Sequence, residues 1–241
     1  MTSNAQLVDE ALGLAVLYRL LASMALYPEP ASVARLRDAD TKLMVSEALK
    51  AIEADERLEL EISRMLTTAA GISPMQWQSE YISVFGHAAS KDCSPYASDY
   101  GVGSVFQQAQ KLADLSAFYS AFGLQTQREE RADHIAVELE FMGYLCHRKA
   151  VCIAETKSDE DAAQLEAARE AFLRQFLAPW AFSFCGLVAK TAEAVESQLF
   201  LSWSGAVESL LAMDRDRLGI NATESVVNLQ PLPPWQPCST D

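Results

Sequence analysis

ERADHIAVELEFMGYL, residues 130–145, joins a charged segment to a strongly apolar run. The run predicts a helix from Asp133 to about Thr156. Asp133 suits the N-cap of this helix, because its carboxylate can accept backbone N–H bonds and offsets the positive end of the helix dipole. A cap alone does not explain His134, nor Glu138, an acid placed within an apolar stripe.

Two roles for this cluster stay open on spacing alone. In the first, Arg131 or His134 pairs with Glu138 in a purely structural network. In the second, the same charged side chains lie beside an apolar surface and bind a partner. The spacing of the residues favours neither role.

The composition favours helix along the whole chain. Half of the 241 residues are hydrophobic, whereas glycine (10) and proline (9) are scarce. Few turn signals for strands are present, so we predict an all-α fold. Helix start and stop signals indicate a single bundle of about nine to ten helices in residues 1–218, followed by an extended or disordered C-terminal tail, residues 219–241. Asn4 and Ser73 are the predicted N-caps of two of these helices, Gly123 is a predicted C-cap, and Pro179 is predicted to begin a new helix.

Charge and cysteine usage limit the partners and the compartment. The formal net charge of -14 disfavours binding to nucleic acid and to anionic lipid. The five cysteines form no CxxC, and the apolar N-terminal stretch lacks a basic region and carries charged residues, so neither a signal peptide nor membrane insertion is expected. These features favour a cytoplasmic protein with reduced thiols.

Signals for metal, phosphate or nucleophilic chemistry are weak. The three histidines, His87, His134 and His147, fall in different segments without HExxH spacing. No GxxxxGK[ST] loop occurs. Cys93 lies in a long loop, but no sequence signal brings a base to it. We therefore predict no metal, no cofactor and no enzymatic activity.

Four stretches together resemble one family. ERADHIAVELEFM resembles the E-R-P-D-H-I-A-x-E-L-E-F-M signature of the TorD/DmsD/NarJ-like cytoplasmic chaperones, which assist the maturation of molybdenum enzymes. QWQSEYISVFG, CSPYASDYG and LADLSAFYSAFGL resemble three further motifs of that family, in the family's order. The resemblance covers about residues 77–180.

The resemblance implies a chaperone that binds the N-terminal leader, often of twin-arginine type, and the apo form of a molybdopterin-dependent catalytic subunit. Such a protein holds its client until the bis-molybdopterin guanine dinucleotide cofactor is inserted, and it exists as a monomer or a segment-swapped dimer. The motif positions make a set of residues candidates for peptide binding: Asp133, His134, Glu138, Tyr96, Phe85, Trp77 and Arg131.

Two departures from the family pattern concern the same region. Ala132 replaces a usual proline, and Ala97 replaces a usual acid after the Pro-Tyr pair. Two other functions remain as alternatives. One is a helical scaffold or dimerisation protein that ignores the leader, and the other is a nucleotide hydrolase that uses Asp133 and His134 as an acid-base pair.

Overall fold

The computed structural model describes residues 3–86, 93–100, 105–125, 130–155 and 159–221. Within these residues the fold is all-α, as predicted, with one isolated bridge in place of any strand pairing. The elements are, in chain order, α1 (Asn4–Met24), α2 (Pro30–Arg37), α3 (Ala39–Ala51), α4 (Glu56–Gly71), α5 (Pro74–Phe85), η1 (Ala97–Asp99), α6 (Val105–Ala121), α7 (Ile135–Ala154), α8 (Asp159–Phe172), η2 (Leu173–Leu177), α9 (Ala178–Ala194) and α10 (Gln198–Arg217).

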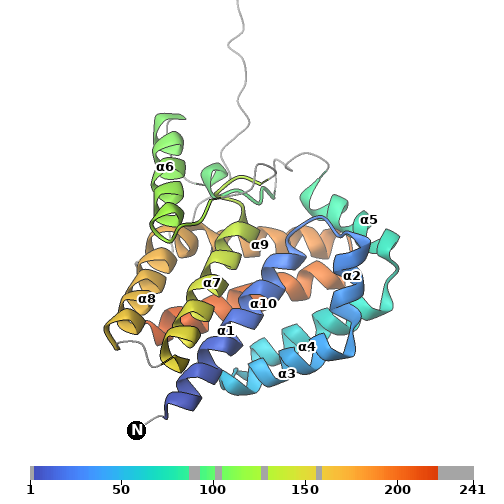
Figure 1. Cartoon of the computed structure of the whole chain (residues 1–241). Coiled ribbons are helices and arrows are strands. Elements are labelled where there is room, and N and C mark those ends of the chain that lie inside the picture. The colour runs from blue at the N-terminus through green and yellow to red at the C-terminus, as the bar shows by residue number, and fades with distance from the viewer. Residues whose placement is uncertain (1–2, 87–92, 101–104, 126–129, 156–158, 222–241) are drawn as a thin grey trace, which may run out of the picture.

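The helices α1 and α7 lie side by side through the middle of the bundle (Figure 1). Their backbones approach closely at Gly143, where an added Cβ would lie 3.2 Å from the carbonyl oxygen of Ala15. Helix α3 packs on α1, α8 packs on α7, and α10 packs against both α4 and α9. Helix α6 projects from one end of the bundle in the same view.

The segment from α8 to α9 is continuous, although Pro179 predicted a new helix there. Pro179 lacks the N–H of an i→i−4 bond and its ring crowds the preceding turn. Immediately before Pro179, the helix widens into the π-helical turn η2. The helical segment therefore continues through the proline. The ten α-helices described thus form nine rods, in agreement with the predicted number.

Several helix ends follow the predicted chemistry. Ser73 caps α5 by accepting the N–H of Gln76, and Gly123 has the left-handed φ of +72° that ends α6. The start of α1 differs from the prediction of Asn4 as N-cap. Ser3 takes that position, because it forms a reciprocal capping box with Gln6.

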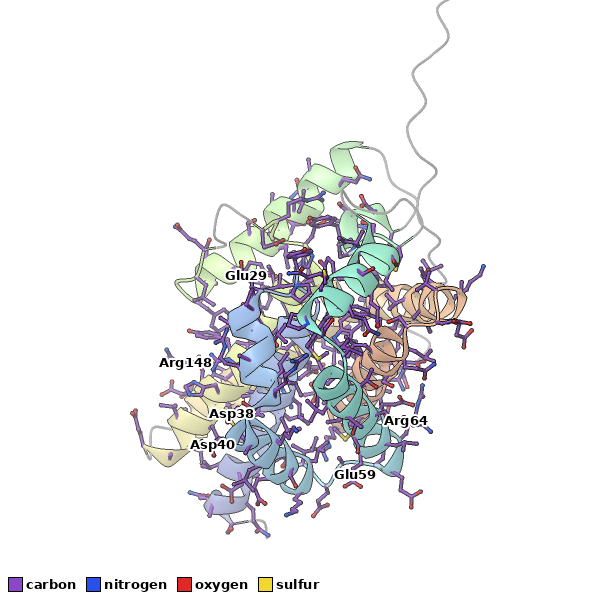
Figure 2. All side chains as sticks on the ribbon, turned by 90° about the vertical axis from the view of Figure 1, so that its right-hand side faces the viewer. Glu29, Asp38, Asp40, Glu59, Arg64 and Arg148 are labelled. Carbon is purple, nitrogen blue, oxygen red and sulfur yellow. The ribbon has the colours of Figure 1, made fainter. Side chains whose placement is uncertain are left out.

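Apolar side chains fill the space between the helices, and charged ones cover the outside (Figure 2). The labelled Glu29, Asp38, Glu59 and Arg64 are all exposed. Residues 160–194 form a helix long and apolar enough to cross a membrane by length and composition. Half of its most apolar window is buried inside the fold, as in core helices of soluble proteins, so it is weak evidence for a span.

Residues 222–241 lie outside the described part of the chain, so the predicted tail is not tested. The described chain ends just after α10, where Ile220 is still buried. The proposed boundary between residues 218 and 219 therefore stays a prediction.

Candidate functional site

The loop–helix junction, which we define as residues 93–100 and 130–138, brings two of the family-like motifs together. An isolated antiparallel bridge pairs Tyr96 with His134. Its two hydrogen bonds run from the N–H of Ala97 to the carbonyl of Asp133 and from the N–H of Ile135 to the carbonyl of Pro95, each 2.9 Å long. The loop is thus fixed by backbone bonds to the start of α7.

Asp133 holds this loop in place and does not cap α7, contrary to the prediction from its sequence position. Its Oδ2 accepts the backbone N–H of Ser98 at 2.9 Å, and both carboxylate oxygens accept hydrogen bonds from the guanidinium of Arg131, at 2.9 and 3.1 Å. The Asp133 side chain is only 3% exposed. Because its charge is already matched by Arg131, Asp133 is a positioning residue within the junction.

The N-cap of α7 is His134. Its Nδ1 accepts the N–H of Ala136 at 3.1 Å, which fixes a neutral ring with the proton on Nε2. Burial lowers the pKa of His134 to about 4, an effect that the nearby charge of Asp133 opposes and that of Arg131 reinforces. Nε2 faces the carboxylate of Glu130 at 4.0 Å. A buried, neutral histidine engaged as a cap gives no support to the acid-base role of the hydrolase alternative.

Tyr96 and Arg131 lie on the outer face of the junction. The Arg131 guanidinium lies 4.4 Å from the centre of the Tyr96 ring, and the ring of His134 meets Tyr96 edge-on at 5.1 Å. Tyr96 is half-buried, and the Arg131 side chain is 46% exposed. Of the predicted peptide-binding residues, these two reach the surface.

Glu138 lies fully inside the bundle, one turn after His134. Its Oε2 accepts a hydrogen bond from Nε1 of Trp180 at 3.2 Å, while Oε1 has no hydrogen-bond partner among the described residues. Burial raises the pKa of Glu138 well above its usual range, although the bond from Trp180 acts in the opposite direction. The pairing of Glu138 with Arg131 or His134 that the sequence suggested does not form. The guanidinium of Arg131 binds Asp133 instead, and the imidazole of His134 accepts the N–H of Ala136 at the start of α7.

Trp77 and Phe85, the two predicted binding residues on α5, are buried as well. Phe85 packs among aromatic rings, with Phe200 at 5.2 Å and Trp203 at 6.1 Å. Trp77 is 1% exposed, and its Nε1 has no hydrogen-bond partner in the part of the chain that the structure describes. Both side chains support the fold beneath the surface.

The described residues contain no group of three or more His, Cys, Asp or Glu side chains that could hold a metal ion. The side chains of Cys93, Cys146, Cys152 and Cys185 are buried. His87 and Cys238 lie outside the described residues.

Comparison with known proteins matches residues 49–186 to the family model described as nitrate reductase delta subunit, more than half of the chain. The chain belongs to this family, the NarJ/TorD-type chaperones. It is also 30% identical over 115 residues to the selenate reductase assembly chaperone protein of Thauera selenatis. That alignment covers 47% of this chain and 55% of the relative, so the chain spans about half the length of the curated relative it matches.

These comparisons support membership of a family of molybdoenzyme maturation chaperones. All four family-like stretches lie within the matched residues. Sequence reasoning missed two of the residues that build the junction: Ser98, which also accepts a hydrogen bond from Arg131, and Tyr119, whose hydroxyl donates to the carbonyl of Ala132 at 3.0 Å. Both lie inside quoted motifs, but their partners are distant in sequence.

Proposed function

We propose that this chain is the cytoplasmic assembly chaperone of one molybdopterin-dependent reductase. It binds the N-terminal twin-arginine leader and the apo form of the catalytic subunit, and it holds them until the bis-molybdopterin guanine dinucleotide cofactor is inserted. The observation that carries this proposal is the family match, which spans every motif of the junction. The relative's role in assembling a selenate reductase supports the same class of client.

At the junction, the proposal assigns two roles to the predicted residues. Tyr96 and Arg131 contact the leader, because they form the accessible face. Asp133, His134 and Glu138 position that face from inside, and Trp77 and Phe85 support it through the core. A half-exposed tyrosine stacked under an arginine offers a rigid apolar plate with little rotamer entropy to lose on binding.

Calorimetric titration with synthetic leaders of the molybdopterin-dependent reductases encoded in the same genome tests this function. One leader is expected to bind saturably to the wild type, and a scrambled leader is not. Tyr96→Ala should weaken binding about tenfold if the ring is an anchor, since buried aromatic anchors contribute about 1–2 kcal/mol or more.

Tyr144→Ala is the matched control, because Tyr144 also lies half-buried beneath an arginine, Arg148, at 5.9 Å, but on the side of α7. It should bind like the wild type. Absence of binding by the folded wild type to any leader would contradict the proposed function. Equal binding by Tyr96→Ala and the wild type would remove the junction as a contact and leave the function intact.

A further inference from the structure

A long hollow runs along α1 on the side of α2 and α3, away from the motif residues. One part, of about 860 Å³, lies between α1 and α3, and a second part, of about 310 Å³, lies between α1, α2 and α3. Both parts are lined by Leu12, Val16 and Met44, so they form one continuous groove. We call it the α1–α3 groove.

The floor of the groove is apolar and open to solvent. Leu12 is 39% exposed and Met44 is 51% exposed. Close packing of α1 on α3 lies directly below, where Gly13 faces the carbonyl oxygen of Ala48 and the side chain of Ile52. The floor is therefore a rigid surface between two packed helices.

The two ends of the groove carry opposite charge. The larger part is lined by four acids and two cations, and each cation pairs with an acid: Arg217 with Glu10 and Lys50 with Glu47, at 2.8 and 2.9 Å. Two exposed carboxylates, Asp9 and Glu53, have no ion-pair partner in the described part of the chain.

The smaller part has the reverse composition. Its lining includes Arg19, Arg35 and His147 and contains no Asp or Glu. Because the chain has a net charge of -14, a basic lining at one end of an apolar groove stands out from the acidic remainder of the protein.

We infer that the α1–α3 groove receives the client leader as a helix, with its cationic N-terminal head at Asp9 and Glu53 and its apolar turns over Leu12, Val16 and Met44. This inference rests on the proposed function and adds a second contact surface to the junction. An amphipathic helix laid in an apolar groove is a recurrent mode of peptide recognition. The polarity also fits a helix: its positive dipole end meets the acidic end of the groove, and its negative end meets Arg19 and Arg35.

A variant at Glu53 can test the acidic end of the groove without destabilising the protein, so weaker leader binding could not be caused by unfolding. Glu53 ends α3 in the left-handed region, with φ of +47°, where glycine is favoured over any residue with a Cβ. Glu53→Gly should therefore raise thermal stability while it removes one carboxylate from the groove. Glu196→Gly is the matched control, since Glu196 is also exposed and has φ of +56°, between α9 and α10.

The apolar contact is tested with a second pair of variants. Met44→Glu places a charge on the floor of the groove, and Met75→Glu places the same charge on a methionine that is 76% exposed at the start of α5. Both substituted positions are exposed, so both variants should fold, which circular dichroism checks.

The experiment is calorimetric titration of these four variants and the wild type with the leader that the wild type binds, at low and high salt. Met44→Glu should weaken binding at least tenfold, because a charge would be buried against the apolar face of the leader. Glu53→Gly should weaken it about two- to fivefold and reduce its salt dependence, as for an exposed ion pair. Both controls should bind like the wild type.

The alternatives give different results. Wild-type binding that Met44→Glu and Glu53→Gly leave unchanged would overturn the groove and keep the proposed function. Absence of wild-type binding to any leader would overturn the function itself. Sedimentation analysis of the free proteins tests whether two copies of the chain associate through the groove. If the wild type were a dimer that Met44→Glu converts to monomers, with unchanged leader binding, the groove would be a self-association surface and the inference would be overturned.

Discussion

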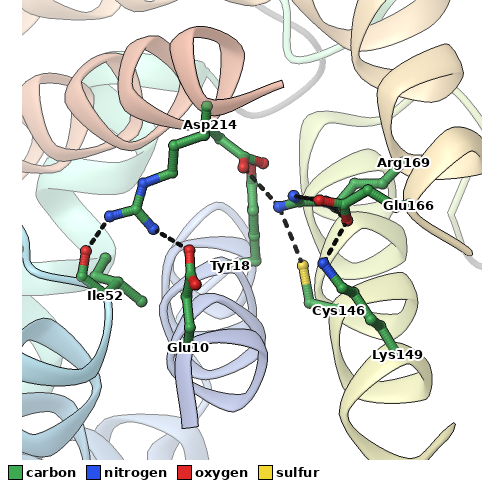
Figure 3. A network of polar contacts seen from close by, with 9 residues as sticks. Glu10, Tyr18, Ile52, Cys146, Lys149, Glu166, Arg169 and Asp214 are labelled. Carbon is green, nitrogen blue, oxygen red and sulfur yellow. Dashed lines mark hydrogen bonds and ion pairs between the residues drawn. The ribbon is translucent and has the colours of Figure 1, made fainter. Parts of the chain in front are cut away.

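Nη1 of Arg169 lies 2.6 Å from Oδ1 of Asp214, and both side chains are buried where α8 meets α10 (Figure 3). The other Asp214 oxygen accepts a hydrogen bond of 2.6 Å from the hydroxyl of Tyr18 on α1. Glu166 binds the far side of the guanidinium, and Lys149 on α7 binds Glu166. One buried ion pair thus ties four helices of the bundle together.

Asp214→Asn should destabilise the protein by about 3–5 kcal/mol, because it leaves the Arg169 charge buried without its nearest counter-charge. Tyr18→Phe removes one hydrogen bond from the same carboxylate and keeps the ion pair, so it should cost about 1–2 kcal/mol. Urea denaturation of the two variants measures the difference. Equal losses would show that the carboxylate acts through its hydrogen bond to Tyr18 and not through its charge.

His134 should make stability depend on pH in the acid range. The pKa of His134 is about 4 in the folded protein, below the usual value of about 6.5 in an unfolded chain, so folding favours the neutral form of the ring. This contribution is complete above pH ~6.5 and is lost as the pH falls toward 4, by about 3 kcal/mol in total. His134→Asn keeps a cap acceptor and removes this titration, so its free energy of unfolding relative to that of the wild type should rise as the pH falls from 6.5 to 4.

Urea midpoints measured across that range provide the comparison. A difference between His134→Asn and the wild type that stayed constant across that range would show that the titration belongs to another group.

The sequence predicted what depends on neighbouring residues. The helical composition gave the fold class, and Ser73 and Gly123 marked helix ends correctly, because caps act through backbone groups within one turn. The error at Pro179 has a local cause as well. A π-helical turn accommodates this proline, and the sequence contains the proline but no signal that predicts the π-helical turn.

The site was harder to predict because its bonds join distant segments. Asp133 fits an N-cap by sequence, but its actual partner is the backbone of Ser98, 35 residues earlier. Only the folded chain shows that this contact moves the cap to His134. Burial of Phe85 likewise depends on α9 and α10, so its motif position could not distinguish a surface contact from a core side chain.

Gly13→Ala should destabilise the protein by about 1–3 kcal/mol. An added Cβ would lie 2.8 Å from the carbonyl oxygen of Ala48 and 2.8 Å from the side chain of Ile52, so α1 and α3 would have to separate. Gly186→Ala is the opposite case, since within the described residues no atom beyond the neighbouring turns of α9 lies within 4 Å of an added Cβ. It should stabilise the protein by about 0.5–1 kcal/mol through helix propensity. Thermal melts of both variants test the packing, and a stable Gly13→Ala would contradict the close approach.

Glu138→Gln should raise stability at neutral and alkaline pH. The pKa of Glu138 is raised in the fold, so the fold holds the proton that the unfolded chain releases above about pH 4.3. Stability from this group is therefore complete below pH ~4.3 and falls as the pH rises toward its folded pKa. A glutamine can accept the same bond from Trp180 without ever ionising.

The difference in free energy of unfolding between Glu138→Gln and the wild type should consequently grow from pH 4 to pH 8, when both are measured in urea. The slope from Glu138 has the opposite sign to that from His134, so the two partly cancel in the wild type between pH 4.3 and 6.5. Removing Glu138 should expose the full acid loss caused by His134, and a variant with a flat pH profile in that range would contradict both assignments.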